Sequence, residues 1–283
     1  MRIAWAVGED FRHLDPDLPL LTAAVTARRI DAHTVVWDDA DVDWDGYDLV
    51  VVRSCWDYVP RRAEFLAWAD AVPRLANPAA VLRWNTDKTY LRTLDEAGVA
   101  VVPTAWSVRS VDDLPAADEW VVKPTVSAGA ADTARWSDPE LAVAHSRRLL
   151  DSGRATMVQP YVDAVDTEGE TGILLFGGTV SHAFRKGALL ARGDDPRSLP
   201  ELKEDIGPRE PSADQVAFAQ HAVRVARELT GQELLYARVD VVTGPDGRPR
   251  LMELELTEPS FFLPHTATGA TTFADALESR LSG

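Results

Sequence analysis

Short apolar runs separated by polar, helix-like segments fill the N-terminal quarter of the chain. Buried strands are predicted at Arg2–Val7, Thr34–Trp37 and Leu49–Arg53, with an amphipathic helix from about Asp17 to Arg29 and another around Ala63–Ala71. Strands that alternate with helices favour a parallel, doubly wound sheet. The turn after the first strand lacks the GxGxxG pattern that seats a dinucleotide pyrophosphate, which disfavours a nicotinamide-dependent enzyme.

The rest of the chain mixes helical segments with strand pairs and shows no internal repeat. A helix is predicted from Asn85 to a glycine stop at Gly98. The polar, proline-bearing segment Ala191–Pro211 is predicted to be a mobile loop that could serve as a lid. The other predicted elements are the strands Val101–Trp106, Trp120–Lys123 and Thr156–Gln159 and the helices Pro139–Leu150, Ser212–Leu229 and Thr272–Leu281.

A first hairpin is predicted around Gly177 and Gly178, which adopt the positive φ values of a two-residue turn without penalty. This turn sets a register that places Glu170 opposite Arg185. The pair is either part of a site or a surface ion pair worth about 0–1 kcal/mol.

A second hairpin is predicted around Asp246-Gly247, and its register puts charged residues face to face. Asp240 faces Glu253, and Arg238 faces Glu255 on the same side of the sheet. Opposed carboxylates repel one another unless positive charge lies between them. Magnesium accepts such oxygen ligands together with nucleotide phosphates. The alternative is that Arg238 neutralises both glutamates on a solvated face.

Two lysines suggest where a phosphate could bind. Lys123 follows the apolar run WVV and precedes the small-residue loop TVSAGAADT, so its ammonium and the loop amides could surround phosphate oxygens. The Walker A pattern is absent. Lys88 is predicted in the first turns of a helix, where a solvated lysine would be unremarkable.

Charge and cysteine content narrow the class of protein. The 29 basic and 45 acidic residues give a net charge of -16, which repels nucleic acid and anionic membranes, so an anionic substrate needs a local positive pocket. The N-terminus has no leader pattern, and no apolar run approaches the roughly 20 residues of a membrane helix. Cys55 is the single cysteine, so it has no internal disulfide partner, and a buried structural thiol is favoured over a nucleophile. A cytoplasmic protein is expected.

Residues at the carboxyl edge of the predicted parallel sheet are candidates for substrate binding. Arg53 ends a strand at the edge where open α/β sheets bind ligands, and it could grip a carboxylate with two hydrogen bonds. A capping or surface arginine is the alternative. Ser260, just beyond the second hairpin, could bind the same substrate. The histidines form no metal-binding spacing.

Five fragments occur in an order that resembles the ATP-grasp superfamily, in its glutathione-synthetase-like branch. They are Lys88 in NTDKTYL, Lys123 in VVKP with the SAGA loop, MVQPYVD, Arg185-Lys186 at a hairpin end, and RVDVV followed by LMELEL. The segments VVRSCWDYVPRRAEFLAWA and ELTEPSFFL are most similar to a bacterial subgroup that includes the cyclo-ligase closing the cycloserine ring.

The resemblance implies an α/β fold with an α+β grasp. Residues 1–83 would form a Rossmann-like substrate domain, and residues 100–165 the central lid subdomain. Residues 84–99 and 166–283 would form the C-terminal subdomain with the metal site.

The resemblance also implies a role for each matching residue. Those expected to bind ATP are Lys88, Lys123, Ser127, Ala128, Gly129, Gln159, Pro160, Tyr161, Val162, Asp163 and Asp166, with Ser127 to Ala130 as the flap. Two magnesium ions are expected to be bound by Asp240, Glu253 and Glu255. Arg185 and Arg238 are expected to be catalytic. The residues expected to bind the substrate are Arg53, Ser54, Glu170 and Ser260. Glu255 stands where the superfamily usually has asparagine, which leaves the ligand count open.

The implied activity is ATP- and magnesium-dependent joining of a small-molecule carboxylate to an amine through an acyl phosphate. The product would be an amide, such as an amino-acid or γ-glutamyl-type dipeptide, and a homodimer is possible. Two alternatives stay open: an intramolecular cyclo-ligase of the cycloserine type, and a non-catalytic nucleotide-binding module. A binding-only module would not need both lysines and all the acids, which argues against it.

Overall fold

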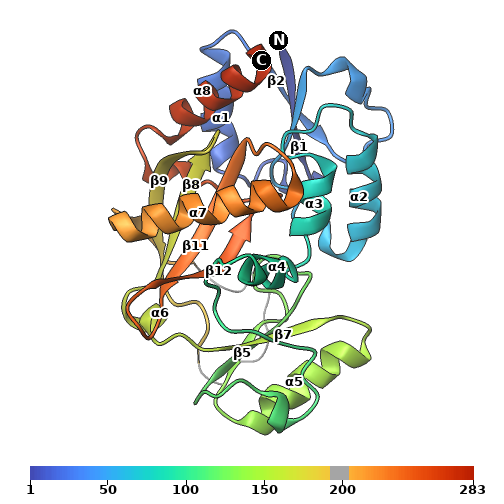
Figure 1. Ribbon diagram of the computed structural model, residues 1–283. Coiled ribbons are helices and arrows are strands. Elements are labelled where there is room, and N and C mark those ends of the chain that lie inside the picture. The colour runs from blue at the N-terminus through green and yellow to red at the C-terminus, as the bar shows by residue number, and fades with distance from the viewer. Residues whose placement is uncertain (192–203) are drawn as a thin grey trace.

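The computed structural model describes residues 1–191 and 204–283, which form three tiers stacked along one long axis (Figure 1). Each tier is built on its own sheet: one of three strands, one of five and one of four. Both ends of the chain lie at the tip of the first tier (Figure 1). In the described part of the chain, no helix combines the length and apolar character that crossing a bilayer requires.

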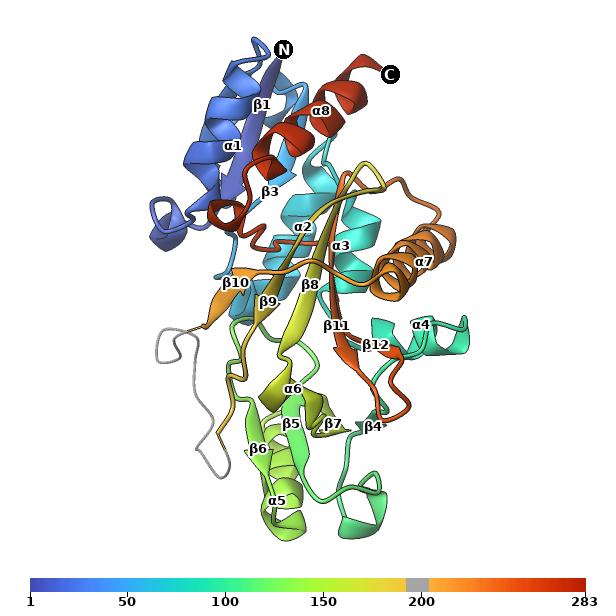
Figure 2. The same cartoon turned by 90° about the vertical axis from the view of Figure 1, so that its left-hand side faces the viewer.

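The first tier is the predicted parallel sheet, with strands in the order β2-β1-β3. Alternate residues of β1 enter two cores: Trp5 and its neighbours on that side pack with α1 and α8, while Ala4 and Ala6 pack with α2 on the other side. The C-terminal helix α8 therefore lies against the N-terminal sheet (Figure 2). The elements are β1 (Arg2–Val7), α1 (Asp17–Thr26), β2 (Asp31–Val36), β3 (Leu49–Val52), α2 (Arg62–Ala71) and α8 (Gly269–Ser282).

The middle tier is an antiparallel sheet with the strand order β10-β9-β8-β11-β12. Helix α7 packs beside it, begins with a capping box at Ser212 and ends at Gly231, whose φ of 63° is natural for glycine. The elements are α3 (Ala79–Asn85), α4 (Tyr90–Glu96), β8 (Glu170–Phe176), β9 (Thr179–Lys186), β10 (Ile206–Pro208), α7 (Ala213–Thr230), β11 (Tyr236–Thr243) and β12 (Pro249–Glu255).

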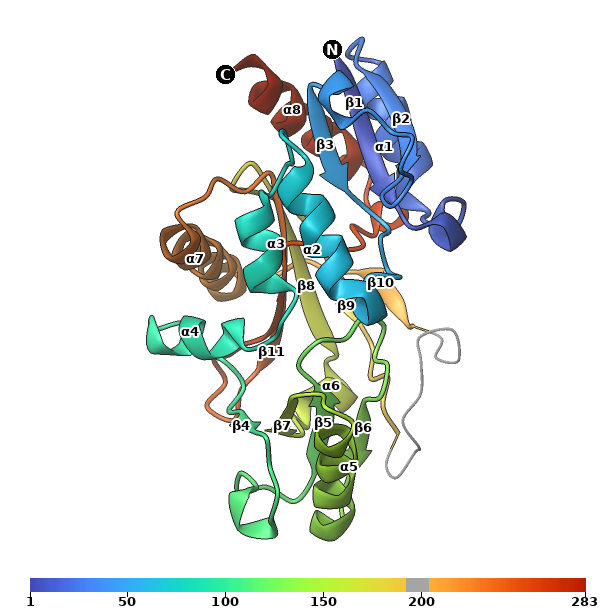
Figure 3. The same ribbon diagram turned by 90° about the vertical axis from the view of Figure 1, so that its right-hand side faces the viewer.

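The third tier is a small antiparallel sheet, β4-β7-β5-β6, covered by helix α5 at the far end of the molecule (Figure 3). The predicted strand Val101–Trp106 is confirmed only at Ala105–Trp106, which forms β4, and is wrong for the residues before it. Val101 forms an isolated β-bridge with Leu251. The elements are β4 (Ala105–Trp106), β5 (Trp120–Pro124), β6 (Ala134–Trp136), α5 (Pro139–Asp151), β7 (Thr156–Pro160) and the short helix α6 (Ala164–Thr167).

A β-bulge corrects the register predicted for the first hairpin. Phe176 pairs with Thr179 as the two-glycine turn requires, but the register shifts after Leu175 because Ser181 is an extra residue on β9. Glu170 therefore faces Lys186, and the predicted pairing of Glu170 with Arg185 is wrong. A one-residue shift moves side chains to the opposite face of the sheet.

The charged pairs predicted in the second hairpin are confirmed. Asp240 pairs with Glu253 and Arg238 with Glu255. Nearer the turn, the residue pairs are offset by one position from the predicted register. A bulge at Met252 accounts for the difference, because Val241 pairs with Leu251.

The helix predicted from Asn85 to Gly98 is two helices with a break between them. Helix α3 ends at Asn85 and α4 begins at Tyr90, so Lys88 lies in the connection rather than in a first helical turn. The Asp87 side chain accepts a hydrogen bond from the backbone of Thr89, and the amide of Lys88 bonds to the third tier at Thr125. This break directs Lys88 toward the loop after β5.

Two other expectations from the sequence have clear outcomes. The segment Ala191–Pro211, predicted as a loop, contains strand β10, while residues 192–203 lie outside the described part of the chain.

Cys55 is fully buried, its Sγ donates to the carbonyl of Ala6, and burial raises the pKa of this thiol well above its usual value. This environment supports the structural role expected for Cys55.

One buried asparagine ties the first tier to the middle tier. The Nδ2 of Asn77 donates to the carbonyls of Tyr236 and Leu256 at 2.9 and 2.7 Å, and its Oδ1 accepts from the amide of Leu235 at 2.8 Å. Asn77 also adopts a φ of 50°, a conformation that asparagine tolerates better than most residues.

We predict that Asn77→Ala lowers the free energy of unfolding by about 2–4 kcal/mol, because it leaves three buried backbone groups without partners. Urea unfolding measures the change, and the exposed Gln220→Ala is the matched control, expected within about 0.5 kcal/mol of the parent. A loss no larger than the control's would contradict this role.

Candidate active site

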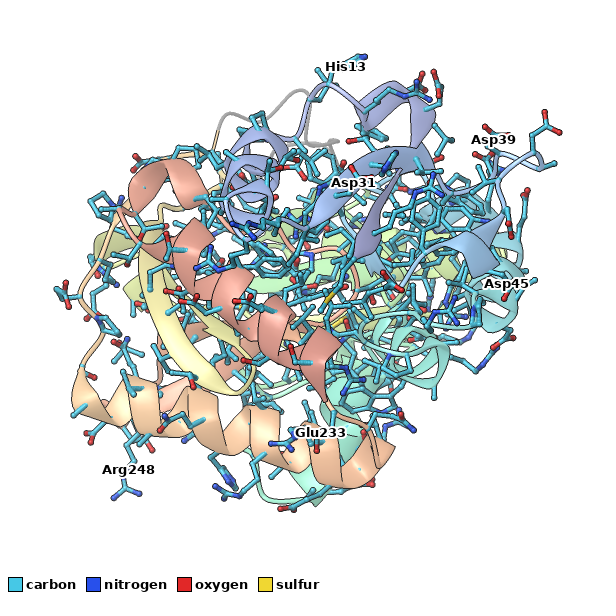
Figure 4. All side chains as sticks on the ribbon, turned by 90° about the horizontal axis from the view of Figure 1, so that it is seen from above. His13, Asp31, Asp39, Asp45, Glu233 and Arg248 are labelled. Atoms are coloured by element: carbon cyan, nitrogen blue, oxygen red, sulfur yellow. The ribbon has the colours of Figure 1, made fainter. Side chains whose placement is uncertain are left out.

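The excess negative charge lies largely on the outside of the molecule. Asp39, Asp45 and Glu233 are exposed, and Asp39 and Asp45 stand at the periphery in the view from above (Figure 4). Lysines and acids that the sequence analysis singled out are instead half-buried or buried where the middle and third tiers meet. Interactions between charges strengthen in such partly desolvated surroundings.

Arg238 links two of the predicted metal ligands. Its Nε lies 2.9 Å from Asp240 Oδ1, and its Nη2 contacts both Asp240 and Glu255. Its Nη1 donates to the carbonyl of Ser260 at 3.2 Å, so the segment after β12 is fixed as well. The alternative interpretation of the sequence, in which Arg238 neutralises both glutamates on a solvated face, is therefore met only for Glu255, since Glu253 pairs with Lys88 and Arg238 itself is buried.

The two lysines and an acid meet at the other side of this face. Lys88 Nζ lies 3.1 Å from Glu253 Oε1 and donates to the carbonyl of Ser127 at 2.8 Å. Lys123, nearly fully buried on β5, interacts electrostatically with Glu253 and Lys88. The structure therefore brings together residues that are separated by 165 positions in the chain, from Lys88 to Glu253.

The pKa shifts of these groups follow from burial and from their neighbours. Burial raises the pKa of Glu253, but Lys88, Lys123 and other cations outweigh it and lower the pKa below its usual value. Burial lowers the pKa of Lys123, and Lys88 adds to that shift while Glu253 opposes it. Glu255 behaves differently from Glu253, since burial and neighbouring carboxylates raise its pKa despite Arg238.

The lysines and acids described above, together with Arg238, form a charged cluster: Lys88, Lys123, Arg238, Asp240, Glu253 and Glu255. Lys186, and not Arg185, lies on the same face of the middle sheet as this cluster. The bulge at Ser181 places Lys186 opposite Glu170, and burial, which alone would lower the pKa of Lys186, is outweighed by Glu170 and Asp240, so that this pKa rises. Arg185 pairs instead with Asp205 at 2.8 Å. The catalytic role expected for Arg185 thus fits the position of Lys186 better.

The predicted metal ligands lie on one face of the sheet but do not form a preformed metal site. Among residues 1–191 and 204–283, no three His, Cys, Asp or Glu side chains are grouped closely enough to hold a metal ion. The Asp240 side chain is only 3% exposed beneath Arg238, whereas Glu253 and Glu255 are 26% and 27% exposed. Magnesium is commonly held by one or two carboxylates together with substrate phosphates, so the two open glutamates fit such an ion.

The segment expected to meet adenine connects β7 to α6. The amide of Tyr161 bonds to the carbonyl of Glu119 at 2.8 Å, and its hydroxyl bonds to Asp166 at 2.5 Å. Arg135, which the sequence analysis did not identify, lies 3.3 Å above the Tyr161 ring and bonds to Asp166 as well. Asp166 is therefore engaged by the protein. The other expected residues are the buried Gln159, the half-buried Pro160 and Val162, and the exposed Asp163.

The loop expected to form a flap lies between β5 and β6. Gly129, Ala130 and Asp132 all have φ values between 54° and 61°, so the loop turns sharply with non-glycine residues in a costly conformation. Lys88 fastens the beginning of the loop through Ser127, while Ala128 and Gly129 are half-exposed.

The structure does not support the expected carboxylate-binding role of Arg53. Its Nη2 lies 3.4 Å from Asp15 and 3.3 Å from Asp17, its Nη1 donates to the carbonyl of Pro259 at 3.0 Å, and the guanidinium lies 3.8 Å above the Phe261 ring. The side chain is 1% exposed. Arg53 is therefore an anchor between the first tier and the segment after β12.

The next residue, Ser54, is fully buried, and its Oγ has no hydrogen-bond partner among the described residues. Glu258, in the segment after β12, was not assigned a role from the sequence, because nothing in TEPS distinguishes it from a solvated acid. It is half-buried and accepts a hydrogen bond from Tyr58. Burial and the Glu255 carboxylate raise the pKa of Glu258 to about 8, while Lys88 opposes the shift.

Comparisons with known proteins find relatives of this chain. Residues 3–77 match the protein-family model described as the N-terminal domain of D-cycloserine synthetase DcsG. The chain is 40% identical over 285 residues to "Cycloserine biosynthesis protein DcsG" of Streptomyces lavendulae, with 95% of each chain covered. A crystal structure of D-cycloserine synthetase DcsG matches with a TM-score of 0.87 and 35% identity over 99% of this chain and 100% of that one.

More distant solved structures share the fold. A D-alanine–D-alanine ligase from Bacillus anthracis complexed with ATP has a TM-score of 0.67 at 13% identity, covering 100% of this chain and 97% of that one. The ATP-grasp ligase PsnB complexed with a minimal precursor has a TM-score of 0.66 at 17% identity, covering 99% and 98%.

We predict that Arg53→Leu destabilises the protein by about 3–5 kcal/mol at pH 7, because two buried carboxylates lose their cation. Burial already raises the pKa of Asp17, with Arg53 opposing the rise, so the folded variant binds protons more tightly than the unfolded chain. Its stability should consequently fall as the pH rises above about 4. Urea unfolding at pH 5 and pH 8 measures both effects. Unchanged stability with a raised KM for the substrate would instead restore the carboxylate-binding role.

Proposed function

This chain belongs to the ATP-grasp superfamily, in the subgroup that contains the cycloserine-forming ligase, and we propose that it closes a ring within one amino-acid derivative. It is an ATP-dependent ligase that forms C–N bonds. The ring would form when a carboxylate, activated by ATP, is attacked by a nitrogen of the same molecule. The intermolecular amide ligase that the sequence analysis ranked first becomes the alternative outcome of the experiment below.

The observation that carries the proposal is the likeness to the cycloserine-forming relative, which spans nearly the whole chain. The ion-paired lysines and acids of this chain are a second, supporting observation. The likeness supports the type of reaction, and the cluster supports its chemistry. Phosphoryl transfer depends on positioning and on neutralising the charge of the phosphoryl oxygens, and lysines converging on one point provide both.

Lys88 and Lys123 are the residues proposed to bind the phosphates of ATP. Both are held at the junction of the middle and third tiers, and Lys88 is already oriented by Glu253 and Ser127. An anionic substrate would compete with Glu253 for Lys88, and the compact ammonium of lysine can turn between the two. Ser127, Ala128 and Gly129 would cover the phosphates from the loop after β5.

Lys186 and Arg238 are proposed to stabilise the transferred phosphoryl group and the acyl phosphate. Both lie on the site face of the middle sheet, where Arg238 pairs with Asp240, and Lys186 lies opposite Glu170 and 3.7 Å from Glu204. Lys186 takes the place of Arg185 because the bulge turns Arg185 away. Glu170, Ser54 and Ser260 remain the proposed contacts to the substrate.

Magnesium would be held by Glu253 and Glu255 together with phosphate oxygens, with Asp240 contributing where Arg238 releases it. When bound, magnesium neutralises negative charge on the phosphates. Two ions are proposed, as the resemblance implies. The nucleobase would lie along Gln159 to Val162, with Asp163 closer to solvent as the proposed ribose contact.

The reaction consists of two substitutions. The substrate carboxylate attacks the γ-phosphorus of ATP, an O–P bond forms, and ADP leaves with the electron pair of the broken bond. The nitrogen then attacks the acyl carbon, a C–N bond forms, phosphate leaves, and the nitrogen gives up a proton. Water would hydrolyse the acyl phosphate, so the site must exclude water before the first step.

We predict that β-aminooxyalanine is cyclised to cycloserine, because its carboxylate and terminal nitrogen belong to one molecule and can close that ring. The purified protein is incubated with ATP, Mg²⁺ and each enantiomer separately, and ADP release and product mass are recorded. A product at the substrate mass minus water, without a second substrate, is the expected result. A condensed mass that requires a second amine would select the intermolecular ligase, and no ADP release with any amino-acid derivative would reject both.

We predict that Lys186→Met lowers kcat by roughly 100-fold or more, whereas Arg185→Met changes it by less than about 5-fold, because only Lys186 faces the charged cluster. The two variants are matched, since they remove neighbouring cations from the same strand. Steady-state rates with saturating ATP provide the measurement. A larger loss in Arg185→Met would return the catalytic role to the arginine.

A further inference from the structure

Glu258 is held firmly at the junction between the first tier and the site face. The Tyr58 hydroxyl donates a hydrogen bond to its carboxylate, and Trp56 Nε1 donates to its backbone carbonyl at 3.3 Å. The next carbonyl, that of Pro259, accepts from Arg53 at 3.0 Å. The turn after β3 therefore fixes both the backbone and the side chain of this glutamate.

Glu258 differs from the three expected metal ligands in having no ion-pair partner within the described part of the chain. Asp240 and Glu255 share Arg238, and Glu253 pairs with Lys88. Throughout the described ranges, 1–191 and 204–283, no lysine, arginine or histidine forms an ion pair with Glu258. A half-buried carboxylate without a cation is costly, so a positive group supplied by a ligand would be bound favourably there.

The surroundings of Glu258 limit what that ligand can be. Glu258 follows Glu255 by three residues, and Arg238 donates to the carbonyl of Ser260 two residues further on, so this position borders the place where the acyl phosphate would form. Glu255, Lys88 and Glu253 also act electrostatically on its carboxylate. Ser54, in the same turn as Tyr58, is fully buried, and its Oγ has no hydrogen-bond partner in the described structure. An ammonium group next to the activated carboxylate satisfies both conditions, because it carries positive charge and several N–H donors.

We propose that Glu258, oriented by Tyr58, binds the α-ammonium group of the amino-acid derivative whose carboxylate is activated. This inference rests on the proposed function and narrows its substrate class to compounds that keep a free amine beside the carboxylate. Glu258 thereby fixes which end of the substrate faces ATP. The charge-assisted hydrogen bonds place the carboxylate rather than taking part in the bond changes.

Binding of the product and of an analogue without the amine tests this role. Calorimetry with ADP and Mg²⁺ present measures the dissociation constants of cycloserine and of 1,2-oxazolidin-3-one, which lacks only the amine. The parent protein should bind cycloserine more tightly than the analogue. Glu258→Gln should weaken cycloserine binding by roughly 10- to 100-fold and leave the analogue unchanged. Tyr58→Phe should cause a smaller loss of the same selectivity.

Matched variants and two further readouts distinguish ammonium binding from a structural, metal-binding or proton-transfer role. The exposed Glu140→Gln should bind both compounds as the parent does, and ADP affinity and unfolding midpoints should match in all variants. Equal weakening of both compounds, or an increased Mg²⁺ requirement for ADP binding, would assign Glu258 a structural or metal-binding role and overturn the inference. Unchanged binding with a reduced kcat would make Glu258 a general base and overturn it too.

The inference and the proposed function can fail separately. If the parent cyclises β-aminooxyalanine while Glu258→Gln binds cycloserine normally, the inference fails alone. If the parent neither cyclises nor binds these compounds, the proposed function fails with it.

Discussion

The whole site depends on pairing cations with acids on a face that is largely withdrawn from water. A chain with a net charge of -16 repels a polyphosphate at long range, so attraction has to come from a few buried lysines. Burial lowers the pKa of Lys123 and so works against its positive charge. Acids such as Glu253 and Glu170 keep positive charge in place, and they also hold each ammonium where a phosphate can displace its partner.

Each of the three tiers supplies residues to the site or fixes a segment that borders it. The middle sheet supplies Arg238 and the acids, the third tier supplies Lys123, and the connection between α3 and α4 supplies Lys88. The first tier contributes through the turn after β3, whose contacts with the segment following β12 are hydrogen bonds from Arg53 and Trp56. One core joins α1 and α8 to residues of β8, β9 and β11, so the first and middle tiers pack together, whereas a separate core lies under α5 in the third tier. A small movement of the third tier would therefore alter the site while leaving the shared core in place.

Sequence patterns predicted those parts of the structure that depend on local rules. The parallel strands of the first tier follow from apolar runs, and the hairpin of β11 and β12 follows from the turn signal at Asp246-Gly247. The predicted pairing of Asp240 with Glu253 is confirmed, but it depends on the bulge at Met252, because the register next to the turn would place Asp240 opposite Met252. Features that depend on tertiary contacts were not predicted from the sequence. They are the break before Lys88, the anchoring of Arg53 and the stacking of Arg135 on Tyr161. An isolated glutamate in a polar segment carries no signal of burial, so Glu258 could be recognised only from the structure. Domain boundaries and the roles of individual site residues stay predictions.

The bulge at Ser181 has a consequence for how such a ligase can diverge. Each hairpin of the middle sheet contains one extra residue, and each extra residue decides which of two neighbouring side chains lies on the proposed site face. Loss or gain of a single codon at the bulge on β9 would exchange a lysine for an arginine on that face while the fold persisted. Alignments of relatives that treat these strands as gap-free would then assign function to the wrong neighbour.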